Sequence, residues 1–146
     1  MRFFFYGTLL DGSDNPVARA VHRLLEPAGP AQARGDLHAV PDGGGWFPAL
    51  LEGSGMVSGQ LYDPREQFSA ADLARLDAYE EYHPDMPATS LYLRKEIDLI
   101  GGGMAQAYLF NQSLPAGSQP IRSGDFRHWL RETGLAPFTG LREAGS

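Results

Sequence analysis

The side chain with the clearest chemical potential is the carboxylate of Glu80, near the end of a segment with helical spacing. On a helical wheel of about 100° per residue, Leu73 lies at zero, Leu76 at about 300° and Glu80 at about 340°. Glu80 therefore lies on the apolar stripe. Because a carboxylate turned toward a core loses hydration, we expect its pKa to rise and polar partners or a water-lined cavity to surround it. Such a group is suited to general-base catalysis near neutral pH.

Other interpretations of this segment stay open. If the helix is rotated or ends early, Glu80 is an ordinary solvated side chain like the neighbouring Glu81. Asp77 lies at about 40° on the same wheel and borders the apolar stripe as well. It either caps or braces a neighbouring loop or forms a catalytic pair with Glu80, as in a glycosidase or another hydrolase. The paired arrangement requires both carboxylates to face one open cleft.

A second candidate element is the loop Tyr6-Gly7-Thr8-Leu9, which follows an aromatic segment with strong strand character. A loop after a strand can direct successive backbone N–H groups at a carboxylate, and Gly7 permits close approach of the backbone. A plain turn from strand to loop is the simpler interpretation. The anion-binding loop stays open as the alternative.

Three further side chains belong to a predicted pair of strands. Tyr92 and Arg94 share one face, because side chains alternate with period two, and Tyr108 lies on the following strand. These residues either hold a substrate or are a cross-strand aromatic pair beside an exposed cation. The four histidines have no metal-binding spacing such as H-E-x-x-H, so no metal site is expected.

Composition and missing motifs narrow the function further. The net charge of -6 argues against nucleic-acid binding, and no window has the roughly 20 apolar residues of a membrane span. The chain has no cysteine, so catalysis by a thiolate is excluded and a reducing compartment is compatible with the sequence. We expect a cytoplasmic protein without a signal peptide. No Walker loop, G-x-G-x-x-G or G-x-S-x-G motif occurs, and no pattern specifies an oligomeric state.

The elements that must position these residues follow from periodicity and turn signals. A helix with Asn15 as its cap and Pro16 as its first residue is expected to end at Pro27 and Gly29. A second helix is expected over 70–81, with a capping box from Ser69 and Asp72. The remaining expectations are strands over 3–6, 31–37, 46–51 and 57–62, a flexible loop at 41–45, a hairpin of 91–99 with 104–110 around Gly101 to Gly103, and a last helix from a Ser123 cap to Gly134.

Together these elements predict one α+β domain over residues 1–146, with a flexible tail from about residue 142. Several strands cluster between two helices, and a third helix follows them. This order is typical of a small mixed sheet, bent or barrel-like, with helices packed on its outside.

The order of several short motifs resembles the gamma-glutamylcyclotransferase-like family. The resemblance extends from Phe3 to the Ser123-Gly124-Asp125 segment, and the joint order is more specific than any one motif. Its motifs are Tyr6-Gly7-Thr8-Leu9, Asn15, Phe47-Pro48-Ala49, Gly59-Gln60-Leu61-Tyr62, Leu76-Asp77-Ala78-Tyr79-Glu80 and Tyr92-Leu93-Arg94.

The resemblance implies a small barrel-like α+β fold and an enzyme that needs no cofactor. Its substrate is a small gamma-glutamyl amide, from which it releases an amine while the glutamyl part closes into pyroglutamate. By motif, Glu80 is the general base, the loop from Tyr6 to Leu9 holds the α-amino acid end of the substrate, and Tyr92 and Tyr108 line the pocket. Arg94 matches more loosely. The alternative is a non-catalytic module that binds a small acidic ligand in the same pocket.

One residue departs from the family's pattern. Glu81 stands where the family often has glycine. A second charge beside the base could reshape the rim of the pocket or raise the pKa of Glu80. The resemblance therefore implies the reaction class rather than a particular gamma-glutamyl compound.

Overall fold

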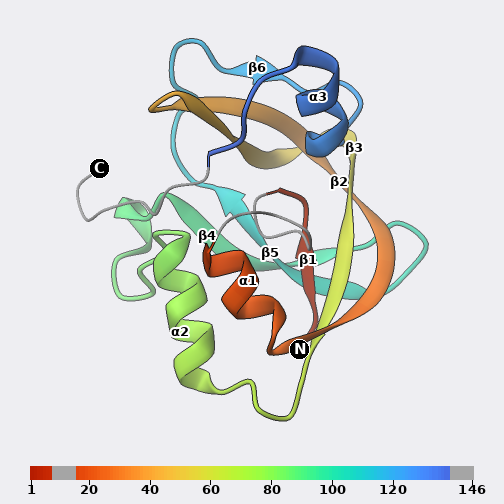
Figure 1. Ribbon diagram of the computed structural model, residues 1–146, viewed down its shortest axis with the longest axis vertical. Coiled ribbons are helices and arrows are strands. Elements are labelled where there is room, and N and C mark those ends of the chain that lie inside the picture. Colours follow the sequence, from red (N-terminus) through yellow and green to blue (C-terminus); the bar gives the residue numbers. More distant parts are fainter. Residues whose placement is uncertain (8–15, 139–146) are drawn as a thin grey trace.

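The computed structural model describes residues 1–7 and 16–138 (Figure 1). Its six strands form one mixed sheet in the order β4-β5-β1-β3-β2-β6, with β1 parallel to β5 and antiparallel to β3. The strands are β1 (Phe3–Phe5), β2 (Leu25–Asp42), β3 (Gly45–Pro64), β4 (Tyr92–Asp98), β5 (Met104–Phe110) and β6 (Gln119–Pro120). The helices are α1 (Pro16–His22), α2 (Ala70–Tyr79) and α3 (Phe126–Thr133), with a short 3-10 helix, η1 (Pro87–Thr89).

The longest feature is the hairpin of β2 and β3, which pair antiparallel from Leu25 with Pro64 to Asp42 with Gly45. Gly43 and Gly44 form its turn with φ of 55° and 89°, the left-handed region that two-residue hairpin turns require. The expected flexible loop at 41–45 is therefore wrong, because Pro41 and Asp42 end β2, Gly45 begins β3, and the turn consists of Gly43 and Gly44. The expected end of the first helix is also wrong, since α1 ends at His22 and Leu25 already begins β2.

Prolines are tolerated in β2 because most of this strand is a sheet edge. On the side away from β3, β6 pairs only with His38 and Ala39. A proline lacks an N–H group, which costs no ladder hydrogen bond where that group would face away from a partner strand. The register shifts between Pro27 and Gly29 and again between Arg34 and Asp36, where bulges bend the hairpin.

The sheet curls until strands from opposite ends approach each other. Ala33 of β2 forms an isolated bridge with Leu99, just after β4, and the N–H of Ile100 donates to the carbonyl of Gln32 at 2.8 Å. The result is a curled half-barrel. The predicted α+β class with a mixed, barrel-like sheet and flanking helices is confirmed.

Two apolar clusters lie on the two faces of the curled sheet, and β1 contributes to both through its alternating side chains. Phe3 and Phe5 pack with Val21 of α1 and Leu76 of α2. Phe4 packs in the other cluster, which includes aromatic residues of α3. Figure 1 accordingly shows α1 and α2 next to each other, well separated from α3. The face covered by α1 and α2 is the one that contains the candidate site.

Local capping signals explain where two helices begin. Ser69 caps α2, and its capping box with Asp72 is confirmed in both directions. The expected Ser123 cap of α3 is wrong, because Asp125 is the cap and its carboxylate accepts from the N–H of His128 at 3.0 Å. Gly134 ends α3 in a left-handed conformation, as predicted. In the described ranges, no helix is long and apolar enough to cross a membrane.

Candidate active site

Glu80 lies at the C-terminal end of α2 and is buried, with 7% of its surface exposed. Its backbone N–H donates to the carbonyl of Leu76 at 3.2 Å, which keeps it in register with the helix although α2 itself ends at Tyr79. Both Leu76 and Tyr79 are buried in the core. The inward orientation expected from the helical wheel is confirmed, and the interpretation of Glu80 as a solvated side chain is wrong.

The chain turns sharply just after Glu80 through a Schellman motif. The N–H of Tyr82 donates to the carbonyl of Asp77 at 2.9 Å, and the N–H of Glu81 donates to Ala78 at 3.0 Å. This motif requires a left-handed residue, and Glu81 has a φ of 52°, a conformation that favours glycine. Glycine would adopt this backbone conformation without strain.

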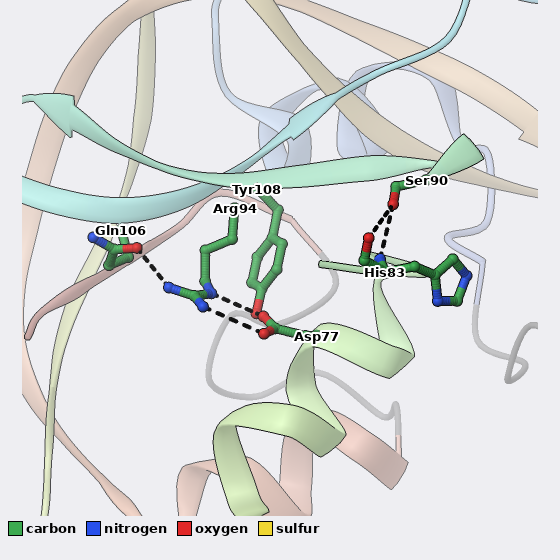
Figure 2. A network of polar contacts seen from close by, with 6 residues as sticks. All are labelled: Asp77, His83, Ser90, Arg94, Gln106 and Tyr108. Carbon is green, nitrogen blue, oxygen red and sulfur yellow. Dashed lines mark hydrogen bonds and ion pairs between the residues drawn. The ribbon is translucent and has the colours of Figure 1, made fainter. Parts of the chain in front are cut away.

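Asp77 lies one turn before Glu80 and is held by three polar contacts, drawn in Figure 2. Its carboxylate accepts from Nε of Arg94 at 2.9 Å, from Nη2 of Arg94 at 3.4 Å and from the hydroxyl of Tyr108 at 2.6 Å. Nη1 of Arg94 donates to Oε1 of Gln106 at 2.8 Å. The ion pair is partly buried, with 19% of the Arg94 side chain and 7% of the Asp77 side chain exposed.

These contacts give the protonation states around Asp77. Burial raises the pKa of Tyr108, and the hydrogen bond to Asp77 and the charges of Asp77 and Glu80 raise it further, so the hydroxyl stays protonated. Burial alone lowers the pKa of Arg94, but the hydrogen bond and charge of Asp77 outweigh that effect and the pKa is raised.

The same contacts disfavour a catalytic pair of Asp77 and Glu80. Both oxygens of Asp77 already bind Arg94, and one of them also accepts from Tyr108. Because both of its oxygens are bound within the protein, the Asp77 carboxylate does not face an open cleft in which it could act as an acid or a base. The expectation that Asp77 caps or braces a loop is wrong as well, because its side-chain partners belong to β4 and β5.

The start of the Tyr6 to Leu9 loop packs against Pro48 of β3. A Cβ atom on Gly7 would lie 2.1 Å from Cγ of Pro48, so glycine is needed here for space. The hydroxyl of Tyr92 donates to the carbonyl of Pro48 at 2.6 Å and fixes the same residue from β4. The hydroxyl of Tyr6 donates to the carbonyl of Tyr108. The loop therefore begins in contact with the strands that hold Asp77.

The structure places Tyr92 and Tyr108 in the apolar cluster under α1 and α2, with Arg94 bound to Asp77 of α2, whereas the Tyr6 ring packs in the cluster on the other face. Tyr6, Tyr108, Asp77 and Arg94 form a continuous chain of hydrogen bonds, whereas Tyr92 binds Pro48. Thr8 and Leu9 lie outside the described residues, as do the cap Asn15 and the tail from residue 142. The roles of all these side chains toward a substrate stay predictions.

Sequence reasoning missed Gln106 and the contact of Arg94 with Asp77. A signal for the strand pairing was present, because a hairpin centred on Gly101 places Arg94 directly opposite Tyr108. Gln106 then follows on the same face by period two. The contact with α2 could not be derived, since no local pattern specifies how a helix is placed over a sheet.

A buried serine braces the segment that follows Glu81. Oγ of Ser90 accepts from the N–H of His83 at 2.8 Å, and the Ser90 side chain is fully buried (Figure 2). The N–H of Leu91 donates to the carbonyl of Glu81 at 3.0 Å. These bonds hold both ends of the loop against the end of α2. No cluster of three or more metal-binding side chains occurs in residues 1–7 and 16–138.

The chain belongs to the family of AIG2-like gamma-glutamyl cyclotransferases: the model described as "Gamma-glutamyl cyclotransferase, AIG2-like" matches residues 3–128. This match includes Glu80, the ion pair and the whole sheet. The family membership suggested by the order of the sequence motifs is therefore confirmed. No curated protein sequence matches the chain significantly.

Several solved structures share the fold. An uncharacterised protein from Pyrococcus horikoshii is 18% identical with a TM-score of 0.67, over 92% of this chain and 96% of that one. An AIG2-like protein from Mus musculus is 24% identical with a TM-score of 0.59, over 98% and 97% of the two chains. Kluyveromyces lactis allophanate hydrolase is 13% identical with a TM-score of 0.70, over 90% of this chain but only 21% of that enzyme.

Proposed function

We propose that this protein is a gamma-glutamyl cyclotransferase that releases an amine from a gamma-glutamyl amide and forms pyroglutamate, with Glu80 as the general acid and base. Membership of the family supports the reaction class. The single structural observation that supports the role of Glu80 is its burial at the end of α2, with 7% of its surface exposed. Burial raises the pKa of a carboxylate toward neutral pH, where general acid–base catalysis is most efficient.

The proposed chemistry is an intramolecular acyl transfer. The α-amine of the glutamyl group attacks the side-chain carbonyl carbon, so a new C–N bond closes the five-membered ring. The bond from that carbon to the leaving amine breaks. Glu80 accepts the proton from the attacking nitrogen and returns it to the leaving nitrogen, and no water, oxidant or cofactor is consumed.

The protein needs to supply little beyond geometry and one proton relay. Holding nucleophile and carbonyl in position can contribute about 7 to 11 kcal/mol in well-oriented intramolecular reactions. In this proposal the loop from Tyr6 to Leu9 holds the α-amino acid end of the substrate, and its N–H groups stabilise the developing oxyanion. The rings of Tyr92 and Tyr108 line the pocket, and both are buried.

A panel of gamma-glutamyl dipeptides and gamma-glutamyl alkylamines tests the function. Each compound is incubated with the wild-type protein, and pyroglutamate and free amine are quantified by chromatography. We expect at least one compound to give both products in equal amounts, without free glutamate. Tight binding by calorimetry with no pyroglutamate from any compound would instead support the binding-module alternative, and free glutamate would indicate hydrolysis.

A further inference from the structure

The turn that contains Glu80 is attached to the β4–β5 hairpin on both sides of the carboxylate. Asp77, one turn before Glu80, binds Arg94 of β4 and Tyr108 of β5. Tyr82, two residues after Glu80, packs its ring under the guanidinium of Arg94, with 5.9 Å from Cζ to the ring centroid. Arg94 therefore contacts side chains on either side of Glu80, and its own position is fixed by Gln106.

The hydrogen bonds of the Schellman motif close this turn, but the turn stands at a helix end and contains a residue in an unfavourable conformation. Glu80 lies just beyond the last helical residue, and Glu81 has the strained left-handed conformation. Fraying is greatest at helix ends, where the last carbonyl groups have no helical partner. Attachment to the sheet through Arg94 opposes that fraying.

We infer that the partly buried Asp77–Arg94 ion pair is a positioning device, which fixes the end of α2 against β4 and β5 and thereby holds the Glu80 carboxylate in its reactive orientation. This inference rests on the proposed function. It differs from the substrate contact that the family resemblance implies for Arg94, because the positive charge of Arg94 is balanced by Asp77 within the protein. Asp77 and Arg94 are positioning residues, and neither exchanges a proton with the substrate.

The test uses Asp77→Asn, Arg94→Gln and the double variant, with Arg2→Gln as the matched control. Arg2 forms an exposed ion pair with Asp63 at 2.8 Å, far from this turn in sequence. For the best substrate of the panel, we expect each single variant to lower kcat about 100-fold with little change in KM, since small misplacements of a reacting group cost this much. Arg2→Gln keeps the wild-type kcat.

The pH profile separates positioning near Glu80 from a purely structural role. Asp77→Asn leaves the positive Arg94 uncompensated, which favours ionised Glu80 and moves the acidic limb of kcat to lower pH by about one unit. Arg94→Gln leaves the negative Asp77 and moves the limb to higher pH. The double variant returns the limb to its wild-type position, but kcat stays low. The three variants leave unchanged the other titratable groups described on and around this turn, which are Tyr79, Glu81, Tyr82, His83, Tyr108 and Tyr6.

Loss of folded protein alone would give a different result. If the variants unfold earlier but keep the wild-type kcat per folded molecule and an unmoved acidic limb, the inference is wrong. If a single variant does not fold at the assay temperature, Tyr108→Phe removes one contact of Asp77 and keeps the ion pair, and we then expect a smaller loss of kcat. Unchanged turnover in Tyr108→Phe would also contradict the inference.

A readout without turnover keeps this inference separate from the proposed function. The carboxyl carbon of Glu80 is followed by NMR while the pH is varied, in the wild type and in both single variants. If the Glu80 titration shifts in opposite directions in Asp77→Asn and Arg94→Gln, the ion pair influences Glu80. This result would support the inference even if no panel compound reacts, and only the proposed function would then fail. If the wild type forms pyroglutamate and the titrations coincide in all three proteins, the function stands and the positioning role is rejected.

Discussion

At the scale of single residues, two carboxylates on one helix face have different environments. Asp77 is bound by Arg94 and Tyr108, whereas Glu80 lies at the buried end of the helix. Different surroundings give neighbouring carboxylates different roles in many active sites. Here Asp77 stays a charged structural partner, and Glu80 is the residue that we propose to transfer the proton.

Tyr108 makes the stability of the folded protein depend on pH in the alkaline range. Its pKa is raised in the folded state, so at alkaline pH the unfolded chain ionises this tyrosine while the folded chain keeps the proton. The contribution of protonated Tyr108 to the free energy of unfolding is therefore complete below the ordinary tyrosine pKa of about 10. Above that value it is lost at about 1.4 kcal/mol per pH unit. Tyr108→Phe removes this dependence.

We expect Tyr108→Phe to be less stable than the wild type at pH 7 by about 1.5 to 3 kcal/mol, the usual worth of a hydrogen bond to a charged group. The difference in the free energy of unfolding should shrink as the pH rises above about 10. Urea denaturation at several pH values from 7 to 11 measures both effects. A difference that stays constant over this range would contradict the raised pKa.

At the scale of elements, the end of α2 contains a testable strain. Glu81 has a φ of 52°, where a Cβ atom is unfavourable and glycine is not. Glu81→Gly should therefore be more stable than Glu81→Ala by about 1 kcal/mol. Thermal or urea unfolding of the two variants measures the difference, and the alanine variant controls for loss of the glutamate side chain. Equal stabilities would show that the turn is not strained.

The contact of the Tyr6 to Leu9 loop with β3 predicts a coupling between two residues. Gly7→Ala places a methyl group where Cγ of Pro48 lies, and we expect a loss of about 1 to 3 kcal/mol in the free energy of unfolding. Pro48→Ala removes the obstructing ring atoms. In the double variant the loss should therefore be smaller than the sum of the two single losses, which a double-mutant cycle measures. Strict additivity would contradict the close approach.

Elements with strong local signals could be predicted from the sequence. The capping box at Ser69 and the apolar stripe located α2, and the glycines at 101–103 located the β4–β5 turn. The long β2–β3 hairpin was divided into shorter segments because prolines and glycines normally interrupt strands, and only the sheet edge explains why they are tolerated. Leu24 and Leu25 continue the helical spacing of α1, so tertiary pairing, not periodicity, decides that Leu25 belongs to a strand.

At the scale of the whole molecule, the curled sheet brings together parts of the chain that are far apart in sequence. Tyr6 follows β1, Asp77 and Glu80 belong to the end of α2, and Tyr108 belongs to β5. Hydrogen bonds join the Tyr6 hydroxyl to the Tyr108 carbonyl and the Tyr108 hydroxyl to Asp77, although the Tyr6 ring packs on the opposite face of the sheet. The order of the motifs, through the family resemblance, predicts that these residues belong to one site. The hydrogen-bond partners of each side chain could be identified only from the structure. The site is therefore a product of the half-barrel and not of any single motif.

The most direct test of the central claim is the turnover of Glu80→Gln on the substrate accepted best by the wild type. Glutamine keeps the shape of glutamate, but its amide cannot accept the proton. With the fold verified by circular dichroism, we expect kcat to fall by about 100-fold to 10,000-fold, while the exposed control Glu66→Gln keeps the wild-type value. A folded Glu80→Gln protein with full turnover of every accepted substrate would contradict the account.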